Sequence, residues 1–132
     1  MTDREELART SMAAFNRRDV EVVVRTFADD AEWWPLRSST EGPYRGHGGI
    51  RAWFEDTAEM FEYLRAEVDE IDERDDIVVA FGRLEVKGRG SGAAIEQPIA
   101  WVFRFAGEKV VWAKSYANRA EAVAEAGVDP DD

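Results

Sequence analysis

The chain has 132 residues, of which 45% are hydrophobic and 34% are charged, and this matches one ordinary globular domain. Its formal net charge of −11 argues against nucleic acid and anionic membrane surfaces as partners. Because it has no cysteine, disulfides and thiolate metal sites are excluded, which fits a cytoplasmic protein.

The first residues are charged and lack the apolar core of a signal peptide. No apolar run approaches the roughly 20 residues that a helix needs to span a bilayer. We therefore expect a cytoplasmic protein with no membrane partner.

Two helices are predicted in the first part of the chain. Thr2 and Glu5 have the spacing of a capping box, and the apolar positions that follow form one helical stripe to about Arg17. Asp19 can cap a second, short helix rich in valine, which we expect to end at the acidic pair 29–30.

A strand, a loop and a long helix are predicted next. The strand covers residues 31–34 and stops at Pro35, and residues 36–49 form a loop because they are rich in Ser, Gly and Pro. The helix that follows has its apolar residues at strongly amphipathic spacing. These residues are Ile50, Trp53, Phe54, Thr57, Phe61 and Leu64.

The second half of the sequence is typical of a sheet. A glycine-rich turn at 88–92 and Gly107 separate apolar segments that read as strands. The last helix spans about 118–126, and 127–132 form a frayed acidic tail. The predicted strands are 65–76, 77–87, 95–105 and 109–117.

This order of elements predicts an α+β fold, because three helices and one strand precede a run of four antiparallel strands and a last helix follows it. The long strands exceed what a small flat sheet needs. We therefore expect a strongly curved, mixed or antiparallel sheet that wraps round the long helix and encloses an apolar pocket. Residues 1–132 would form a single domain.

Three segments, "FADDAEWWP", "GPYRGHGGIRAWF" and "WVFRFAGEKVVWAKSYANR", resemble in their order the SnoaL-like polyketide cyclases. These belong to the superfamily of ketosteroid isomerase and nuclear transport factor two. The resemblance covers about residues 3–126 and implies a cone-shaped sheet closed by three helices, a deep apolar cavity and a homodimer packed through the sheets. Members include isomerases, dehydratases, cyclases and an epoxide hydrolase, so the resemblance implies no single reaction.

Within that superfamily, "GRLEVK" is similar to the stretch of limonene epoxide hydrolase that carries an Arg-x-Asp pair. The resemblance implies that Arg83 matches the arginine and that Glu85 matches the general acid. Ser115 stands where the hydrolase has a water-activating carboxylate, and Trp33 stands where it has a pocket tyrosine. These two departures argue against epoxide hydrolysis.

Arg83 and Glu85 are the candidate catalytic residues. Side chains two residues apart in a strand share a face, so both point the same way. If that face lines the pocket, Glu85 could move a proton while Arg83 sets its ionisation and stabilises developing negative charge. The alternative is a structural salt bridge at the rim of the sheet.

The candidate ligand-binding residues are mostly aromatic. Trp33, Trp53 and Trp101 could form the pocket walls, with Tyr63 at the edge, although each could equally be plain core. His47, at the start of the long helix, is either an acid/base or anion-binding group or part of a glycine-rich turn. A lone histidine cannot build a His-rich metal site, so we expect neither a metal nor a cofactor.

Two functions remain open. The first is a cofactor-free isomerase, dehydratase, cyclase or hydrolase that acts on a small, apolar, oxygenated molecule. The second is a non-catalytic ligand-binding or dimeric interaction protein. The predicted partners are a small ligand and a second copy of the chain.

Overall fold

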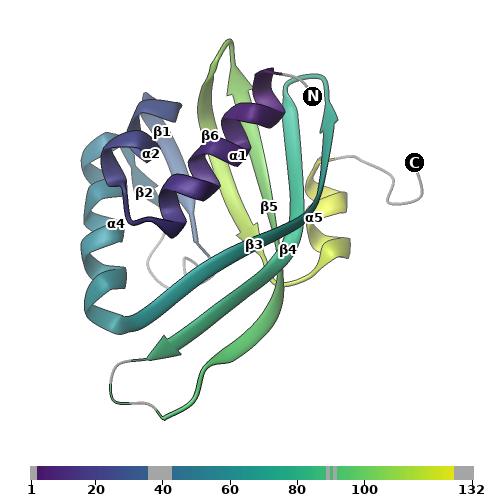
Figure 1. Ribbon diagram of the computed structural model, residues 1–132. Helices are drawn as coiled ribbons and strands as arrows, with labels where there is room; N and C mark the ends of the chain where they lie inside the picture. The colour runs from purple at the N-terminus through teal and green to yellow at the C-terminus, as the bar shows by residue number, and fades with distance from the viewer. Residues whose placement is uncertain (1–2, 36–42, 89, 91, 127–132) are drawn as a thin grey trace.

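The computed structural model describes residues 3–35, 43–88, 90 and 92–126 (Figure 1). The helices are α1 (Asp3–Asn16), α2 (Val20–Thr26), α4 (Gly46–Met60) and α5 (Arg119–Ala126). The strands are β1 (Phe27–Trp34), β2 (Tyr44–Arg45), β3 (Phe61–Arg74), β4 (Ile77–Gly88), β5 (Ile95–Ala106) and β6 (Lys109–Tyr116). Thr2, the acidic tail and parts of the predicted loop and of the glycine-rich turn lie outside the described residues.

The strands form one sheet in the order β2-β1-β6-β5-β4-β3. Neighbours pair antiparallel except β1 and β6, which run parallel, so the sheet is mixed. Figure 1 shows its long strands curving past α1, with α4 at one side. The predicted α+β class with a curved mixed sheet is therefore confirmed.

A β-bulge and a close backbone approach coincide where β3 pairs with β4 at Gly82. The register shifts between Val68, which pairs with Gly82, and Glu70, which pairs with Phe81, so β3 carries one extra residue at this point. A methyl group built on Gly82 would lie 1.8 Å from the carbonyl oxygen of Glu67. Such a bulge bends a strand, and a strand glycine allows close approach of two backbones.

The bent sheet is buried on both faces. Ala80 and Phe103 belong to the main core cluster, on the concave face that α1, α2 and α4 cover. Val79 and Val102 belong to a second cluster on the convex face, which α5 covers. Figure 1 shows α1 in front of the sheet and α5 behind it.

Helix α1 is fixed to the edge strand β3 by a side chain. The Asn16 carboxamide accepts a hydrogen bond from the Ala66 N–H and donates one to the Ala66 carbonyl, both at 2.8 Å. Asn16 thus takes the place of a neighbouring strand and satisfies an otherwise unpaired edge. At the other end of the helix, Arg4 donates to the Asp75 carbonyl at 2.7 Å.

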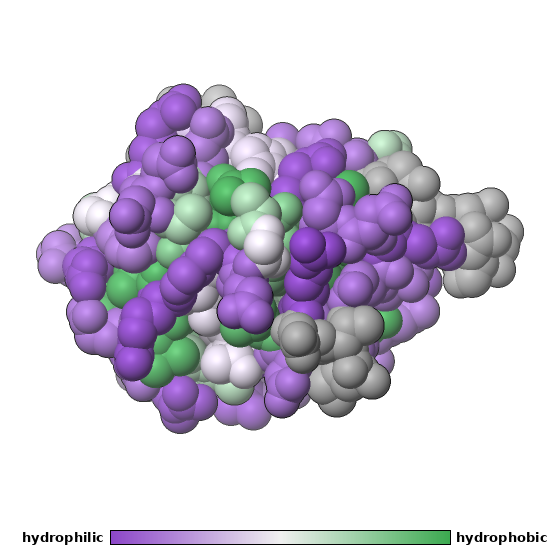
Figure 2. Space-filling view, turned by 90° about the horizontal axis from the view of Figure 1, so that it is seen from above, coloured by the Kyte–Doolittle hydropathy of each residue, from purple (hydrophilic) through white to green (hydrophobic). Residues whose placement is uncertain are grey.

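The outer surface is mostly hydrophilic. Seen from above in Figure 2, polar side chains dominate this face, and hydrophobic residues show between them in smaller areas. No helix of the described segments is long and apolar enough to cross a membrane.

Several elements differ from the sequence prediction. The long helix ends at Met60, because Phe61 adopts an extended backbone and begins the pairing of β3 with Gly88 of β4. Strand β1 begins at Phe27, where it pairs with Val110, and not at residue 31. Strand β2 was not predicted, since its two residues carry no periodicity of their own.

Replacing Gly82 by alanine is expected to destabilise the fold by about 3 kcal/mol, because the new methyl group would clash with the β3 backbone and not with a flexible side chain. Urea unfolding followed by circular dichroism measures the change. Gly48→Ala is the matched control, since a methyl group there meets no atom within 4 Å. Equal stability of Gly82→Ala and wild type would show that the close approach does not fix the bend.

Tyr116 holds α5 against the convex face, since its hydroxyl donates to Glu125 Oε1 at 3.0 Å. Burial, aided by this bond to a carboxylate, raises the pKa of Tyr116 above its usual value. The stability that this group contributes is therefore complete below about pH 10, where an unfolded tyrosine is still protonated, and is lost as the pH rises towards the folded pKa.

Tyr116→Phe is expected to cost about 1 kcal/mol near neutral pH, because one buried hydrogen bond is lost. Above about pH 10 the variant should lose less stability than wild type, since it has no phenol to ionise on unfolding at this position. Urea titrations at about pH 8 and about pH 11 compare the two proteins. An equal loss of stability between the two pH values in both proteins would contradict the role of Tyr116 ionisation.

Candidate functional site

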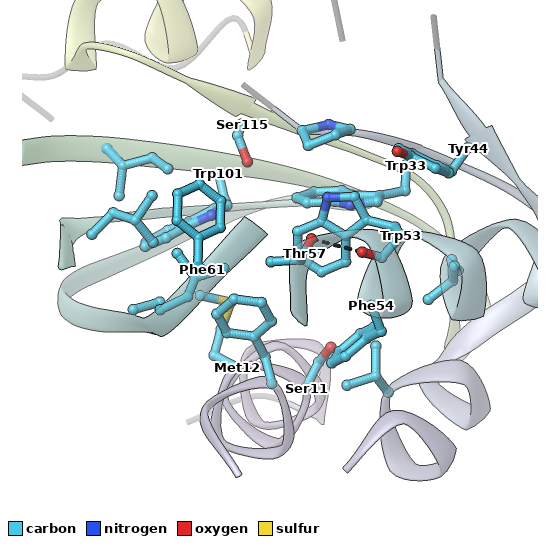
Figure 3. A pocket seen from close by; sticks show the side chains of 18 of the residues that line it. Ser11, Met12, Trp33, Tyr44, Trp53, Phe54, Thr57, Phe61, Trp101 and Ser115 are labelled. Atoms are coloured by element: carbon cyan, nitrogen blue, oxygen red, sulfur yellow. Dashed lines mark hydrogen bonds between the residues drawn. The ribbon is translucent and has the colours of Figure 1, made fainter. Parts of the chain in front are cut away.

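A cavity of about 390 Å³ lies between the concave face of the sheet and helices α1 and α4 (Figure 3). Helix α1 contributes Met12, helix α4 contributes Phe54 and Thr57, and the sheet contributes Ile99 and Trp101. Because the sheet bends round these helices, its concave face remains partly uncovered by their side chains.

Packed aromatic rings form one wall of the cavity. Trp53 of α4 stacks on Phe15 with ring centroids 5.5 Å apart, and it meets Trp33 and Phe54 edge to face at 5.3 and 5.2 Å. Such pairs favour defined geometries, so this wall offers a flat surface that is already ordered. The Nε1 atom of Trp33 is buried and makes no hydrogen bond.

Two buried polar side chains lie on the sheet side of the cavity, where the lining also includes the exposed Gln97. Trp101 of β5 and Ser115 of β6 are register partners and both line the cavity, with 4% and 6% of their surfaces exposed. Figure 3 shows the Ser115 hydroxyl near the Trp101 indole. Within the described part of the chain, neither the indole N–H nor the hydroxyl makes a hydrogen bond.

The rim of the cavity carries a carboxylate and a phenol. Tyr44 of β2 and Asp56 of α4 both belong to the lining, and the Tyr44 hydroxyl donates to Asp56 Oδ2 at 3.2 Å. Asp56 is exposed to solvent. Of the described residues that line the cavity, Asp56 is the one Asp, Glu, Lys, Arg or His.

The structure brings three of the predicted ligand-binding residues together. Trp33, Trp53 and Trp101 all line the cavity, from β1, α4 and β5 respectively. Their position agrees with the proposed walls, while their contact with a ligand stays a prediction. The aromatic face of β5 that carries Trp101 is the concave face.

Tyr63 and His47 lie elsewhere. Tyr63 is 39% exposed and borders a shallow surface depression together with Glu85. The His47 Nε2 atom is 2.8 Å from the Phe27 carbonyl and 3.8 Å from Asp29 Oδ1, so this ring joins the start of α4 to β1. Neither side chain lines the cavity, and a ligand-binding role for either stays a prediction.

Arg83 and Glu85 also face away from the cavity. Arg83 forms a two-fold hydrogen-bonded pair with Asp69, at 3.1 and 3.3 Å, and lies 3.8 Å from Glu96. The bond to Asp69 and the charges of Asp69 and Glu96 raise the pKa of the Arg83 guanidinium. Its side chain is 47% exposed, on the convex side, and Asp69 is the extra residue of the β3 bulge. The predicted location of the pair is therefore wrong.

The error has a simple physical cause. Successive residues of a strand point to opposite faces, and Leu84 and Val86, on either side of Glu85, line the cavity. The face shared by Val79 and Phe81 is equally apolar, but α5 covers it from the convex side. Because β4 is buried on both faces at its start, hydrophobicity could not identify the cavity face.

Sequence reasoning missed Tyr44 and Asp56. Tyr44 lies at the end of a predicted loop, and Asp56 lies between apolar positions of the long helix. The signal for Asp56 was weak but present, because it comes three residues after Trp53 and so falls near the apolar stripe. Among the described residues, no group of three or more His, Cys, Asp or Glu side chains could hold a metal ion.

Comparison with known proteins identifies both a sequence family and a set of similar folds. A family model described as a SnoaL-like domain matches residues 8–113. A structure of an NTF2-like protein of unknown function from Burkholderia pseudomallei has 23% identity and a TM-score of 0.82, covering 94% of this chain and 97% of that chain. No curated protein matches the chain.

Two further structures share the fold. TerC, co-crystallised with polyporic acid, is 22% identical with a TM-score of 0.81 and covers 94% of this chain and 97% of its own. A ketosteroid isomerase-like protein from Catenulispora acidiphila, in complex with trimethylamine, is 19% identical with a TM-score of 0.78, covering 96% and 95%. At these identities the likeness shows the fold alone.

Proposed function

The chain belongs to the SnoaL-like domain family, and from this premise we propose that its cavity binds a small, uncharged, largely apolar molecule that carries oxygen. The observation that carries the proposal is the cavity lining, which is aromatic and aliphatic apart from a few separated polar groups. An ionised ligand would lose its hydration there without a buried counter-charge, which is costly. The cavity volume also falls within the range of roughly 300–1,000 Å³ that is usual for small-molecule sites.

The tryptophans are the proposed walls of this site. Trp33 and Trp53 form part of an ordered aromatic wall, and Trp101 lies on the sheet beside them. Flat rings bury large areas at low entropic cost, which suits a ring-containing ligand. The crystallisation of TerC with polyporic acid supports small-molecule binding within this fold.

Binding is measured by quenching of tryptophan fluorescence with a panel of ketones, quinones, epoxides and hydroxylated polyketide-like compounds. Val86→Trp places an indole in the cavity from a half-buried lining position, so we expect it to lower affinity by roughly tenfold or more. Glu85→Gln, one residue away on the opposite face, is the matched control and should bind like wild type. Unchanged affinity in Val86→Trp would contradict binding in this cavity.

A second candidate function is proton-transfer catalysis at the same site. The specific observation is the hydrogen-bonded Tyr44–Asp56 pair at the rim, since a carboxylate and a phenol can act as base and acid on a bound molecule. Isomerisation, dehydration, cyclisation and hydrolysis can all proceed by such transfers without a cofactor. This pair replaces Arg83 and Glu85 as the proposed acid–base groups.

Exchange of the acidic α-protons of 1-tetralone for deuterium, followed by proton NMR, tests this second candidate without knowledge of the natural reaction. We expect wild type to accelerate the exchange and Asp56→Asn to reduce the acceleration by roughly 10²-fold or more, with binding retained. Glu59→Gln, an exposed carboxylate on α4 outside the lining, is the control. Equal acceleration by Asp56→Asn and wild type would exclude Asp56 as the base in this exchange. If wild type gives no acceleration, the result would favour a non-catalytic binding protein.

A homodimer through the sheet remains part of the proposal. Trp112, Lys114 and Tyr116 lie on the convex face, where the Lys114 ammonium is 5.3 Å from the Tyr116 ring centroid and 5.4 Å from that of Trp34. The convex end of the sheet beyond α5 thus presents aromatic rings beside a cation. A second copy of the chain could pack against this surface.

A further inference from the structure

Trp101 and Ser115 are buried polar residues on the sheet side of the cavity, and they come from neighbouring strands. Residues directly opposite each other in an antiparallel pair have Cβ atoms about 5 Å apart on the same face. Trp101 and Ser115 are such partners, and both side chains are more than nine-tenths buried. Their polar groups can therefore reach a single ligand atom.

The two groups have no other partner in the described structure. Neither belongs to the fully buried polar atoms without a partner, as Trp33 Nε1 does, so both remain accessible from the cavity that they line and can hydrogen-bond to a molecule inside it. An indole N–H can only donate, and a serine hydroxyl can donate as well. The complementary ligand atom is therefore a hydrogen-bond acceptor with two lone pairs.

A neutral carbonyl oxygen meets this requirement. A carboxylate would also accept two hydrogen bonds, but no Lys, Arg or His occurs among the described lining residues to balance its charge. An alcohol could accept from the Trp101 N–H and donate to the Ser115 oxygen, but the serine proton would then be left without an acceptor, whereas a carbonyl oxygen accepts from both donors. The chemistry thus favours a ketone or quinone.

We propose that Trp101 and Ser115 form a carbonyl-binding subsite, and that the ligand class of this cavity is a ring ketone or quinone. This inference rests on the proposed function and restricts the proposed ligand to a narrower chemical class. The indole N–H and the serine O–H donate to one carbonyl oxygen, while the ring system lies against the wall formed by Trp33 and Trp53.

The test compares 9-fluorenone with fluorene, which has the same ring skeleton without the carbonyl group. In wild type the carbonyl compound should gain affinity from two hydrogen bonds. Ser115→Ala and Trp101→Phe should each lower the affinity for fluorenone by roughly three- to tenfold and leave that for fluorene within about twofold. Tryptophan quenching or calorimetry measures both ligands.

The carbonyl stretching band of bound fluorenone gives a second readout, because hydrogen bonds to the oxygen move this band to lower wavenumber. We expect the shift in wild type and its partial reversal in Ser115→Ala. Glu59→Gln is the control, since Glu59 is exposed on α4 and lies outside the lining. It should change neither the affinity ratio nor the band.

The outcomes separate this inference from the function on which it rests. Binding of both compounds with an affinity ratio and a band position that Ser115→Ala leaves unchanged would overturn the carbonyl subsite alone. A failure of both compounds to bind wild type would overturn the subsite together with the proposed ring-ligand function. Loss confined to fluorenone in the two subsite variants supports the inference.

Discussion

The close approach of two backbones at Gly82 is the constraint on which the rest of this structure depends. The Glu67 carbonyl occupies the space that a side chain on Gly82 would need, and the extra residue Asp69 lengthens β3 at the same level. A bulge and a glycine at one point concentrate the bend of a sheet there. The concave face thus produced, with α1 and α4 across it, leaves room for the cavity. A flat sheet of the same residues would pack its aromatic side chains directly against the helices.

The bend also explains the charged pair on β4. Arg83 follows Gly82 directly and points to the convex side, where its guanidinium holds the carboxylate of Asp69. The Arg83 guanidinium thus neutralises Asp69, the residue that the bulge leaves without a partner on β4. Both side chains are about half exposed, so their pairing orients the bulge more than it stabilises the fold. Arg83 of β4 therefore contributes to the shape of the cavity through the bulge, although its side chain lies on the convex face.

The chemistry of the pocket follows from which polar groups the cavity retains. Its walls are rings packed on one another, its sheet side carries an indole N–H and a hydroxyl, and its rim carries Tyr44 and Asp56. Membership of the SnoaL-like family does not choose among binding, isomerisation, dehydration, cyclisation and hydrolysis. That choice depends on the few polar side chains, and their identity is particular to this chain.

The sequence by itself determined the α+β class, the order of the major helices and strands, and the aromatic face of β5. Helical and strand periodicities are local, and the run Trp101, Phe103 and Phe105 alternates with the less apolar Arg104, so these features could be predicted. Only the tertiary structure decided which face of β4 lines the cavity, because Val78 and Val79 are buried on opposite sides. The same holds for the end of α4, where pairing of Phe61 with β4 prevails over helical spacing, and for the meeting of Trp101 with Ser115. Each of these depends on the register of residues far apart in the chain, and a local pattern carries no information about register.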